Sequence, residues 1–324
     1  MTNMLLILLS PDAYLWLVAL ALTALTLALW LCRRRLRRGW LRWGLAVLLS
    51  VFWCVFIYGS FIGVSQLEIR HVEFASEDLP AAFDGYRIVQ FSDAHVPTYT
   101  GWRRELLRQA VDSINAQHGD LIVFTGDLQN KEPTEIEPFC SELSRLKAKD
   151  GVYSVLGNHD YAMYLDVDLY QQARNLEATV DCETRAGWHV LINQRHKIRR
   201  GGDSIYIAGM ENDGEGRFPQ LGDINKALRG LDRQSFVVML EHDPSAWRRK
   251  ILPECHAQLT LSGHTHGMQF EIFGWCPLSI LNRDCDGLYR VGERCLYVTK
   301  GVGGVVPFRL GCAPEIVVIT LRKK

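Results

Sequence analysis

The chain has 324 residues, of which 48% are hydrophobic and 22% charged, a balance typical of a folded protein rather than of a disordered one. Its 36 basic and 36 acidic residues give no net charge, but six arginines and a single acid, Asp12, precede residue 66, which leaves a net charge of −5 on the remainder. That distribution argues against an extended basic surface, so no nucleic-acid partner is expected.

Two long uncharged segments open the chain, at residues 14–32 and 43–64. Each is close to the ~20 apolar residues needed to cross a bilayer, and tryptophans stand near their ends, where amphipathic rings prefer the membrane interface. We therefore predict an integral transmembrane hairpin over residues 1–65, followed by a large domain over residues 66–324. A cleaved signal peptide fits poorly, because the start of the chain is not basic and a second apolar segment follows the first.

Between the two segments lies an arginine-rich loop, RRRLRRGWLR, at residues 33–42. Short loops of this kind stay on the cytoplasmic side of a membrane. Both chain ends, and the large domain with them, are therefore predicted to lie outside the cytoplasm of a multi-pass cell-membrane protein. The alternative is that the arginines only contact anionic lipid headgroups.

The chain has nine cysteines, and none of them forms a CxxC pair, so a zinc-ribbon interpretation has no support. Scattered core cysteines are the simplest interpretation. One or two disulfides are the alternative, with Cys276, Cys285 and Cys295 as the candidates.

From about residue 68, short apolar runs alternate with stretches of helical spacing. Residues 102–118 and 135–149 carry apolar side chains three and four positions apart, as on one face of a helix. Strand–helix–strand alternation predicts crossover connections and largely parallel pairing. The runs predicted to be strands are residues 86–91, 121–125, 152–156, 236–240 and 257–261.

A cluster of polar side chains follows each of these five runs, as in SVLGNHDY at residues 154–161. Because ligands gather at the carboxyl ends of the strands in open α/β sheets, the clusters should meet in one cleft. Five of the ten histidines lie in these clusters, and five independent coincidences of this kind are not expected. The candidate metal ligands are Asp93, His95, Asp127, Asn158, His242, His264 and His266.

Imidazoles, carboxylates and an amide oxygen form a mixed nitrogen and oxygen set that suits Mn, Fe, Zn or a similar divalent ion. Seven ligands are too many for one tetrahedral ion. They are about right for two divalent ions that share a bridging carboxylate.

The five clusters resemble the signature of the calcineurin-like metallophosphoesterase superfamily, D-x-H, G-D, G-N-H-D/E, a lone His and G-H-x-H, in the correct order. The resemblance covers roughly residues 70–324. Segments such as GHTHGMQ (263–269) and LYVTKGVG (296–303) are similar to a membrane-associated bacterial branch of that superfamily. The resemblance implies an α/β fold, a four-layer αββα sandwich with two central mixed sheets.

The resemblance also implies a role for each residue. Asp93, His95 and His266 would hold one metal ion, and Asn158, His242 and His264 would hold the other. Asp127 would bridge the two ions. His159 would not be a ligand but a catalytic residue, which protonates the departing oxygen while a metal-activated hydroxide attacks phosphorus.

Two positions depart from the family pattern. Asn130 stands where many relatives carry an acid that orients the catalytic histidine; an amide can hold the ring but cannot stabilise its positive form by charge, and Asp160 is a possible substitute. Met268 replaces a glycine and is expected to line the cleft or pack beside it.

The leading interpretation is a membrane-anchored, dinuclear-metal hydrolase of phosphodiester-type bonds, with Mn favoured over Fe, Zn or Ni. Its substrate would be a phosphorylated small molecule or lipid, for example a lipid or envelope-linked compound at the bilayer surface. One alternative is a pyrophosphatase of a nucleotide-linked lipid, which would suit the cytoplasmic side better. The other is a non-catalytic metal-binding scaffold, against which the presence of all seven ligands argues.

Overall fold

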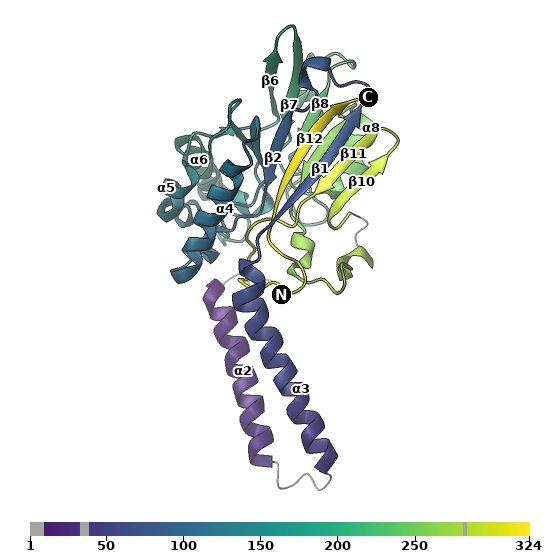
Figure 1. The fold of residues 1–324 in the computed structure, drawn as a ribbon. Coiled ribbons are helices and arrows are strands. Elements are labelled where there is room, and N and C mark those ends of the chain that lie inside the picture. The colour runs from purple at the N-terminus through teal and green to yellow at the C-terminus, as the bar shows by residue number, and fades with distance from the viewer. Residues whose placement is uncertain (1–9, 33–38, 281–283) are drawn as a thin grey trace.

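A computed structural model describes residues 10–32, 39–280 and 284–324 of the chain. Two apolar helices, α2 (Pro11–Cys32) and α3 (Gly39–Ile57), project as a hairpin from one end of the domain (Figure 1). The second helix continues through a π-helical turn at Tyr58–Ile62 and a 3₁₀ turn at Gly63–Ser65. By length and composition both helices can cross a membrane, with a mean hydropathy of 2.3 each. Most of the predicted arginine loop, residues 33–38, lies outside the described residues.

Most apolar side chains of the hairpin face away from the protein, including Leu25, Trp30 and Phe52, each more than half exposed. The hairpin is fastened to the domain at its upper end, where the buried guanidinium of Arg103 donates a hydrogen bond to the Asp12 carboxylate. The hairpin therefore presents an apolar surface that the domain does not cover. The division of the chain at residues 65 and 66 stays a prediction.

Two six-stranded mixed sheets form the centre of the domain. In the first, with the order β1-β12-β2-β3-β4-β5, β12 and β2 run antiparallel and the other neighbours run parallel. Its strands are β1 (Glu68–Ser76), β2 (Arg87–Phe91), β3 (Leu121–Phe124), β4 (Val152–Ser154), β5 (His189–Val190) and β12 (Glu315–Lys323).

The second sheet has the order β10-β11-β9-β8-β7-β6. Antiparallel hairpins form both of its edges, and the strands between them run parallel. Its strands are β6 (Gln194–Arg200), β7 (Asp203–Gly209), β8 (Val237–Leu240), β9 (Leu259–Ser262), β10 (Gly287–Val291) and β11 (Arg294–Val298).

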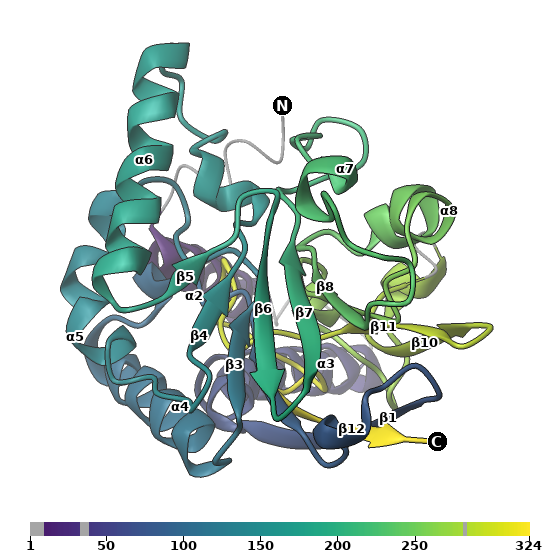
Figure 2. The same ribbon diagram turned by 90° about the horizontal axis from the view of Figure 1, so that it is seen from above.

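The sheets pack face to face, and helices cover their outer faces, as the view from above shows (Figure 2). Buried side chains of both sheets, such as Val123, Val238 and Ile319, form the core between them. The predicted four-layer αββα sandwich is thus confirmed. The outer helices are α4 (Arg104–Ala116), α5 (Cys140–Leu143) and α6 (Leu169–Arg185) on the first sheet and α7 (Ile224–Ala227) and α8 (Leu252–Glu254) on the second.

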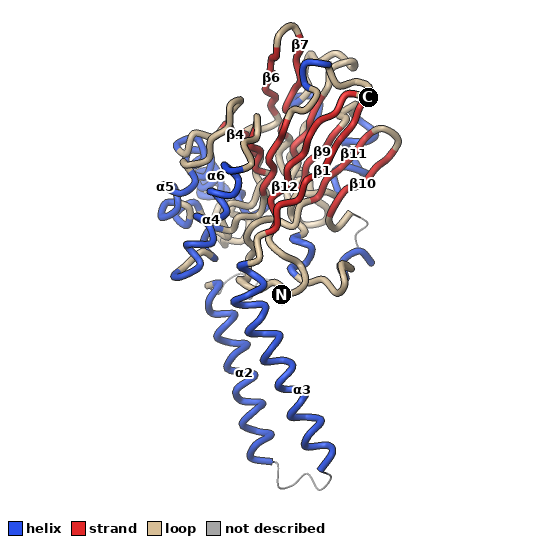
Figure 3. The backbone as a smooth tube through the Cα atoms, in the orientation of Figure 1, coloured by secondary structure: helices blue, strands red, loops and turns tan. Residues whose placement is uncertain are grey.

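The helix predicted over residues 135–149 is wrong as a continuous element. The chain there forms 3₁₀ turns at Pro133–Glu135 and Glu137–Phe139 and only one turn of α-helix in α5. Pro138 explains the break, because proline lacks an N–H and its ring clashes with the preceding turn of a helix. The five predicted strands correspond to β2, β3, β4, β8 and β9, and their ends lie within one or two residues of the prediction. Figure 3 shows how much of the chain between them is loop.

Candidate metal centre

All seven predicted ligands come together at the carboxyl ends of β2, β3, β4, β8 and β9. The loops after these strands deliver them from five separate parts of the chain. Four side chains form one group, Asp93, His95, Asp127 and His266, whose ligand atoms lie within 4.8 Å of one another. Asp127, His242 and His264 form a second group by the same measure. Asp127 is common to both groups, as expected of a bridging carboxylate.

In the first group, ring nitrogens and carboxylate oxygens lie close to one another. Nε2 of His95 lies 3.3 Å from Nε2 of His266 and 3.6 Å from Oδ2 of Asp127. Nε2 of His266 lies 3.4 Å from Oδ1 of Asp93.

In the second group, Nε2 of His242 lies 3.2 Å from each of three atoms. These are Oδ2 of Asp127, Oδ1 of Asn158 and Nδ1 of His264. Asn158 presents its oxygen to the group because its amide nitrogen donates to the hydroxyl of Tyr164 at 2.8 Å.

Hydrogen bonds outside the groups decide which ring nitrogens face inward as acceptors. Nδ1 of His242 donates to the main-chain carbonyl of Thr125 at 2.7 Å, and Nδ1 of His95 donates to Oδ1 of Asn130 at 2.7 Å. In the neutral rings Nε2 then carries only a lone pair. Acceptors packed this closely repel one another unless a proton or a metal cation lies among them. The donor set therefore fits divalent metal ions, with the outer hydrogen bonds fixing the ligand rings as they do in metal sites.

The main chain at the site is held in a conformation that side-chain-bearing residues rarely adopt. Five of the seven candidate ligands have a left-handed backbone: Asp93 (φ 52°), His95 (φ 42°), Asp127 (φ 62°), His264 (φ 73°) and His266 (φ 52°). Each costs ~1–2 kcal/mol relative to the right-handed region. Strain of this kind collects at functional sites, where the surrounding fold holds it in place.

Asp160 helps to stabilise this strained main chain. Its fully buried carboxylate accepts main-chain hydrogen bonds from Asp127 and Gly157 at 2.8 Å each, from Leu128 at 3.0 Å and from Gln129 at 3.3 Å. Glycine is required at position 157 by close approach, because a Cβ there would collide with the Asp127 carboxylate.

His159, the predicted catalytic residue, lies beside both groups. Its main-chain N–H donates to Oδ1 of Asp127 at 2.9 Å, and its Nδ1 donates to the main-chain carbonyl of Asn130 at 2.7 Å. The ring packs on Tyr164, with 4.3 Å between ring centroids. Nε2 is thereby the atom of His159 left to face a substrate.

Of the two departures from the family pattern, the one at Asn130 is resolved differently from expectation. Asn130 does not hold the His159 ring with its amide; its side chain orients His95, and its main-chain carbonyl orients His159. Asp160 does not substitute for the missing acid, because its carboxylate is taken by main-chain N–H groups. Met268 is 45% exposed and has a left-handed backbone (φ 57°), which accounts for glycine being common at this position in relatives.

Burial and mutual charge shift the pKa values of the site residues in both directions. Burial raises the pKa of Asp93 to about 7; burial alone would lower the pKa of His242, but Asp127 raises it to about 10. Burial alone would raise the pKa of Asp127, but the imidazoles of His242 and His159 hold it well below its ordinary value. Burial, with the neighbouring His159, lowers the pKa of His95 to about 3, and burial also lowers those of His264 and His266. The bridging position is therefore anionic, and these three rings are neutral, as metal ligands must be.

A pocket of about 390 Å³ opens beside His264. Its walls include Phe218, whose ring meets that of His264 edge to face, and Arg248, which forms two hydrogen bonds of 2.7 Å with Asp284. Asp243 also lines it, with Oδ2 lying 3.5 Å from Nε2 of His264. Sequence reasoning missed Tyr164, Phe218 and Asp243. Only Asp243, next to His242 in the chain, carried any signal in the sequence.

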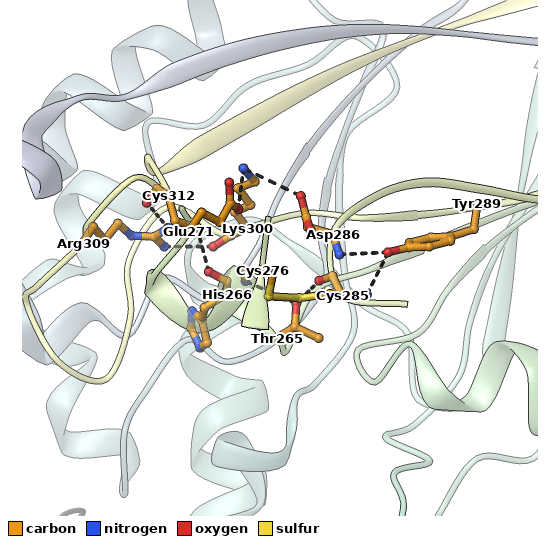
Figure 4. Close-up of a disulfide and its surroundings, with 11 residues drawn as sticks. Thr265, His266, Glu271, Cys276, Cys285, Asp286, Tyr289, Lys300, Arg309 and Cys312 are labelled. Carbon is orange, nitrogen blue, oxygen red and sulfur yellow. Dashed lines mark hydrogen bonds and ion pairs between the residues drawn. A yellow bond between two sulfur atoms is a disulfide. The ribbon is translucent and has the colours of Figure 1, made fainter. Parts of the chain in front are cut away.

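The loop that carries His266 is braced by a disulfide and an ion pair (Figure 4). Cys276 is joined to Cys285, and Cys295, the third cysteine considered, is buried and free. Nζ of Lys300 lies 2.7 Å from the carboxylate of Glu271. Arg309 is buried and donates to main-chain carbonyls, including that of Lys300 at 2.8 Å, so it stabilises the loops rather than reaching into the site.

Comparison with known proteins agrees with this geometry. The sequence model of the calcineurin-like phosphoesterase family matches residues 86–268, more than half of the chain. The chain belongs to this family, whose members are metal-dependent hydrolases of phosphoesters.

Two relatives show how far the similarity extends. The chain is 31% identical over 280 residues to a "Transmembrane protein with metallophosphoesterase domain" of Danio rerio, covering 82% of this chain but only 60% of that protein. It is 30% identical over 274 residues to the metallophosphoesterase YkuE of Bacillus subtilis (strain 168), covering 82% of this chain and 89% of that protein.

Proposed function

We propose that the chain is a membrane-anchored phosphodiesterase that works with two divalent metal ions. Mn²⁺ is the ion we favour. Asp93, His95 and His266 would hold one ion, and Asn158, His242 and His264 would hold the other, with Asp127 between them. The observation that carries the proposal is the convergence of acceptors on Asp127. Ring nitrogens of His95 and His242 approach the same carboxylate oxygen, Oδ2, at 3.6 and 3.2 Å.

When bound, a pair of divalent ions clamps a phosphoryl group and lowers the pKa of water at the site toward neutrality. The chain supplies the remaining chemistry. His159 keeps a hydrogen on Nδ1 through the Asn130 carbonyl, so a second proton resides on Nε2 when the ring is charged. From Nε2 it would pass to the oxygen of the leaving group. The pocket beside His264 would receive one of the two ester groups.

The membrane part of the proposal depends on α2 and α3. Their exposed apolar surfaces would lie in the bilayer, with the domain on the extracytoplasmic side. Two features of the chain support that side independently. The arginines between the helices favour a cytoplasmic loop. The Cys276–Cys285 disulfide favours an oxidising compartment, because disulfides are rare in the cytosol. A substrate borne by a lipid or by the cell envelope would then lie within reach.

The test uses the full chain, purified in detergent, with bis(4-nitrophenyl) phosphate as substrate. We expect hydrolysis with Mn²⁺ present, loss of activity in EDTA and recovery when Mn²⁺ is restored. Asp127→Asn should reduce both the bound metal, measured by elemental analysis, and the rate. The exposed control Asp181→Asn should change neither. Hydrolysis that persists in EDTA, or two equivalents of metal retained by Asp127→Asn, would contradict the proposal.

A further inference from the structure

An exposed apolar turn follows His264 and His266 in the chain. We call residues 272–275 the apolar loop, after its side chains Ile272, Phe273 and Trp275. Ile272 and Trp275 are each 48% exposed, and Phe273 is fully exposed. The loop is a tight turn with Phe273 and Gly274 at its tip. Ile272 and Trp275 close it with reciprocal main-chain hydrogen bonds of 3.1 and 3.0 Å.

The residues at the tip of the turn are not those that would stabilise it best. Both tip residues have a left-handed backbone, with φ of 52° at Phe273 and 76° at Gly274. Two-residue turns of this kind favour Asn-Gly or Asp-Gly, because a bulky side chain is disfavoured at positive φ. Here an aromatic ring occupies the strained position and is fully exposed in the described part of the chain. Burial of this ring would therefore have to come from a contact outside the described residues.

The loop is also firmly mounted. On one side, Glu271 donates its main-chain N–H to the carbonyl of Leu310 at 2.8 Å and pairs with Lys300. On the other side, Cys276 is bonded to Cys285, as Figure 4 shows. The main-chain carbonyl of Cys285 in turn accepts a hydrogen bond from the Thr265 hydroxyl, between the two histidines. The apolar loop and the His264–His266 segment are thus parts of one braced unit.

The position of this unit indicates what it meets. The segment of residues 266–280, lime green in Figure 1, lies at the edge of the domain from which α2 and α3 extend. Figure 3 shows the same segment as loop between two short helical turns, level with the upper ends of these helices. If the two helices span the membrane, this edge of the domain faces the bilayer surface.

We propose that the apolar loop inserts into the headgroup–acyl boundary of the bilayer beside the hairpin. Phe and Trp side chains are suited to that depth. The inference rests on the proposed membrane anchorage of α2 and α3, and it goes further, because it gives the domain a second attachment. Two attachments fix how the domain is tilted, so that the loop with His264 and His266 faces the lipid surface.

Photocrosslinking in the full chain tests the proposal. p-Benzoylphenylalanine replaces Phe273 in protein reconstituted into vesicles of phosphatidylethanolamine and phosphatidylglycerol. After irradiation, lipid adducts are measured by mass spectrometry. The matched control is Val291, which is 44% exposed and is the last residue of β10. Two residues later Glu293 pairs with the C-terminal residue Lys324, and the C-terminus lies at the end of the domain opposite α2 and α3 (Figure 1). The reference for membrane contact is Phe52 in α3. We expect adducts at position 273 close to the level at position 52 and several-fold above the level at 291.

The outcomes separate this inference from the proposal on which it rests. Adducts at position 52 with no excess at 273 over 291 would overturn membrane contact by the loop while leaving the anchor intact. Absence of adducts at position 52 would overturn the anchor and the loop contact together. A covalent dimer formed through position 273 would assign the loop to a second copy of the chain and would also overturn the proposal.

Discussion

Asn130 holds two histidines at once: its side-chain oxygen accepts a hydrogen bond from Nδ1 of His95, and its main-chain carbonyl accepts one from Nδ1 of His159, each at 2.7 Å. A substitution at position 130 therefore removes only the first contact, since the carbonyl remains in any residue. The two histidines have different proposed roles, so the effects of such a substitution can be told apart.

We expect Asn130→Ala to weaken metal binding by ~10–100-fold, the usual cost of losing the hydrogen-bonding partner of a ligand histidine. At saturating Mn²⁺ the kcat should stay close to that of the native chain, because His159 keeps its partner. Titration of activity against free Mn²⁺ measures both quantities. A lower kcat with unchanged metal affinity would mean that the side chain of Asn130 acts on His159 after all.

His159→Ala should show the opposite pattern. The main-chain N–H that donates to Asp127 persists, so bound metal should remain at the native level. Without a proton donor at the leaving oxygen, kcat should fall ~10²–10⁴-fold. Elemental analysis and steady-state kinetics on the same preparation check the two halves. Normal turnover in this variant would remove the acid role from His159.

The sequence predicts where the site lies better than it predicts the hydrogen bonds and packing that orient its side chains. Strand-end motifs are local, so Asp93, Asp127 and His242 could each be placed at the carboxyl end of a strand from the sequence alone. The second hydrogen bond of Asn130 could not be foreseen, because it depends on a main-chain carbonyl whose direction is set by the strained turn at Asp127. The packing of Tyr164 on His159 likewise depends on how a loop folds back.

The segment after β3 shows where periodicity misleads. The apolar residues at helical spacing, Ile136, Phe139, Leu143 and Leu146, are all buried, so the pattern correctly identified the inward face. The inferred helix was nevertheless wrong. Burial requires only that these side chains reach the core, and successive 3₁₀ turns around Pro138 achieve this as well as one helix would.

Asp160 should be a major contributor to stability. Its replacement by Ala would leave four main-chain N–H groups, three of them from Asp127 to Gln129, without their buried acceptor, at ~1–3 kcal/mol for an unsatisfied group. We expect Asp160→Ala to lower the unfolding free energy by at least ~3 kcal/mol. Denaturant unfolding in EDTA measures the effect in the absence of metal.

Asp160→Asn should also destabilise, because its NH₂ group would face two N–H donors. The control is Asp181→Ala, which removes an exposed ion pair with Arg185 and should cost less than ~1 kcal/mol. If Asp160→Ala and Asp181→Ala unfolded alike, the carboxylate of Asp160 would not be what holds the strained loop.

Glu183 predicts a pH dependence of stability. Burial, with nearby Asp160, raises the pKa of Glu183 well above its ordinary value, and only one of its two carboxylate oxygens has a partner among the described residues, the Ser154 hydroxyl. The folded chain then keeps a proton that the unfolded chain releases above about pH 4.3. Stability should therefore fall as the pH rises from that value toward the raised pKa.

Glu183→Gln removes this linkage while nearly preserving shape. Its unfolding free energy should match that of the native chain near pH 4 and exceed it by ~1 kcal/mol or more at pH 8. Glu177→Gln, at an exposed position on the same helix, should show no such divergence. Parallel curves for the native chain and Glu183→Gln across this range would mean that Glu183 is ionised in the folded protein.

The disulfide and the side of the membrane can be tested together. In the chain purified without reductant, a maleimide reagent applied after denaturation should modify seven cysteines, and after reduction all nine. A reporter active only outside the cytoplasm, fused after Lys324, should be active if the arginines between α2 and α3 keep their loop in the cytoplasm, as we propose. An active cytoplasmic reporter with nine free thiols would place the domain inside and favour a pyrophosphatase of nucleotide-linked lipids over an extracytoplasmic phosphodiesterase.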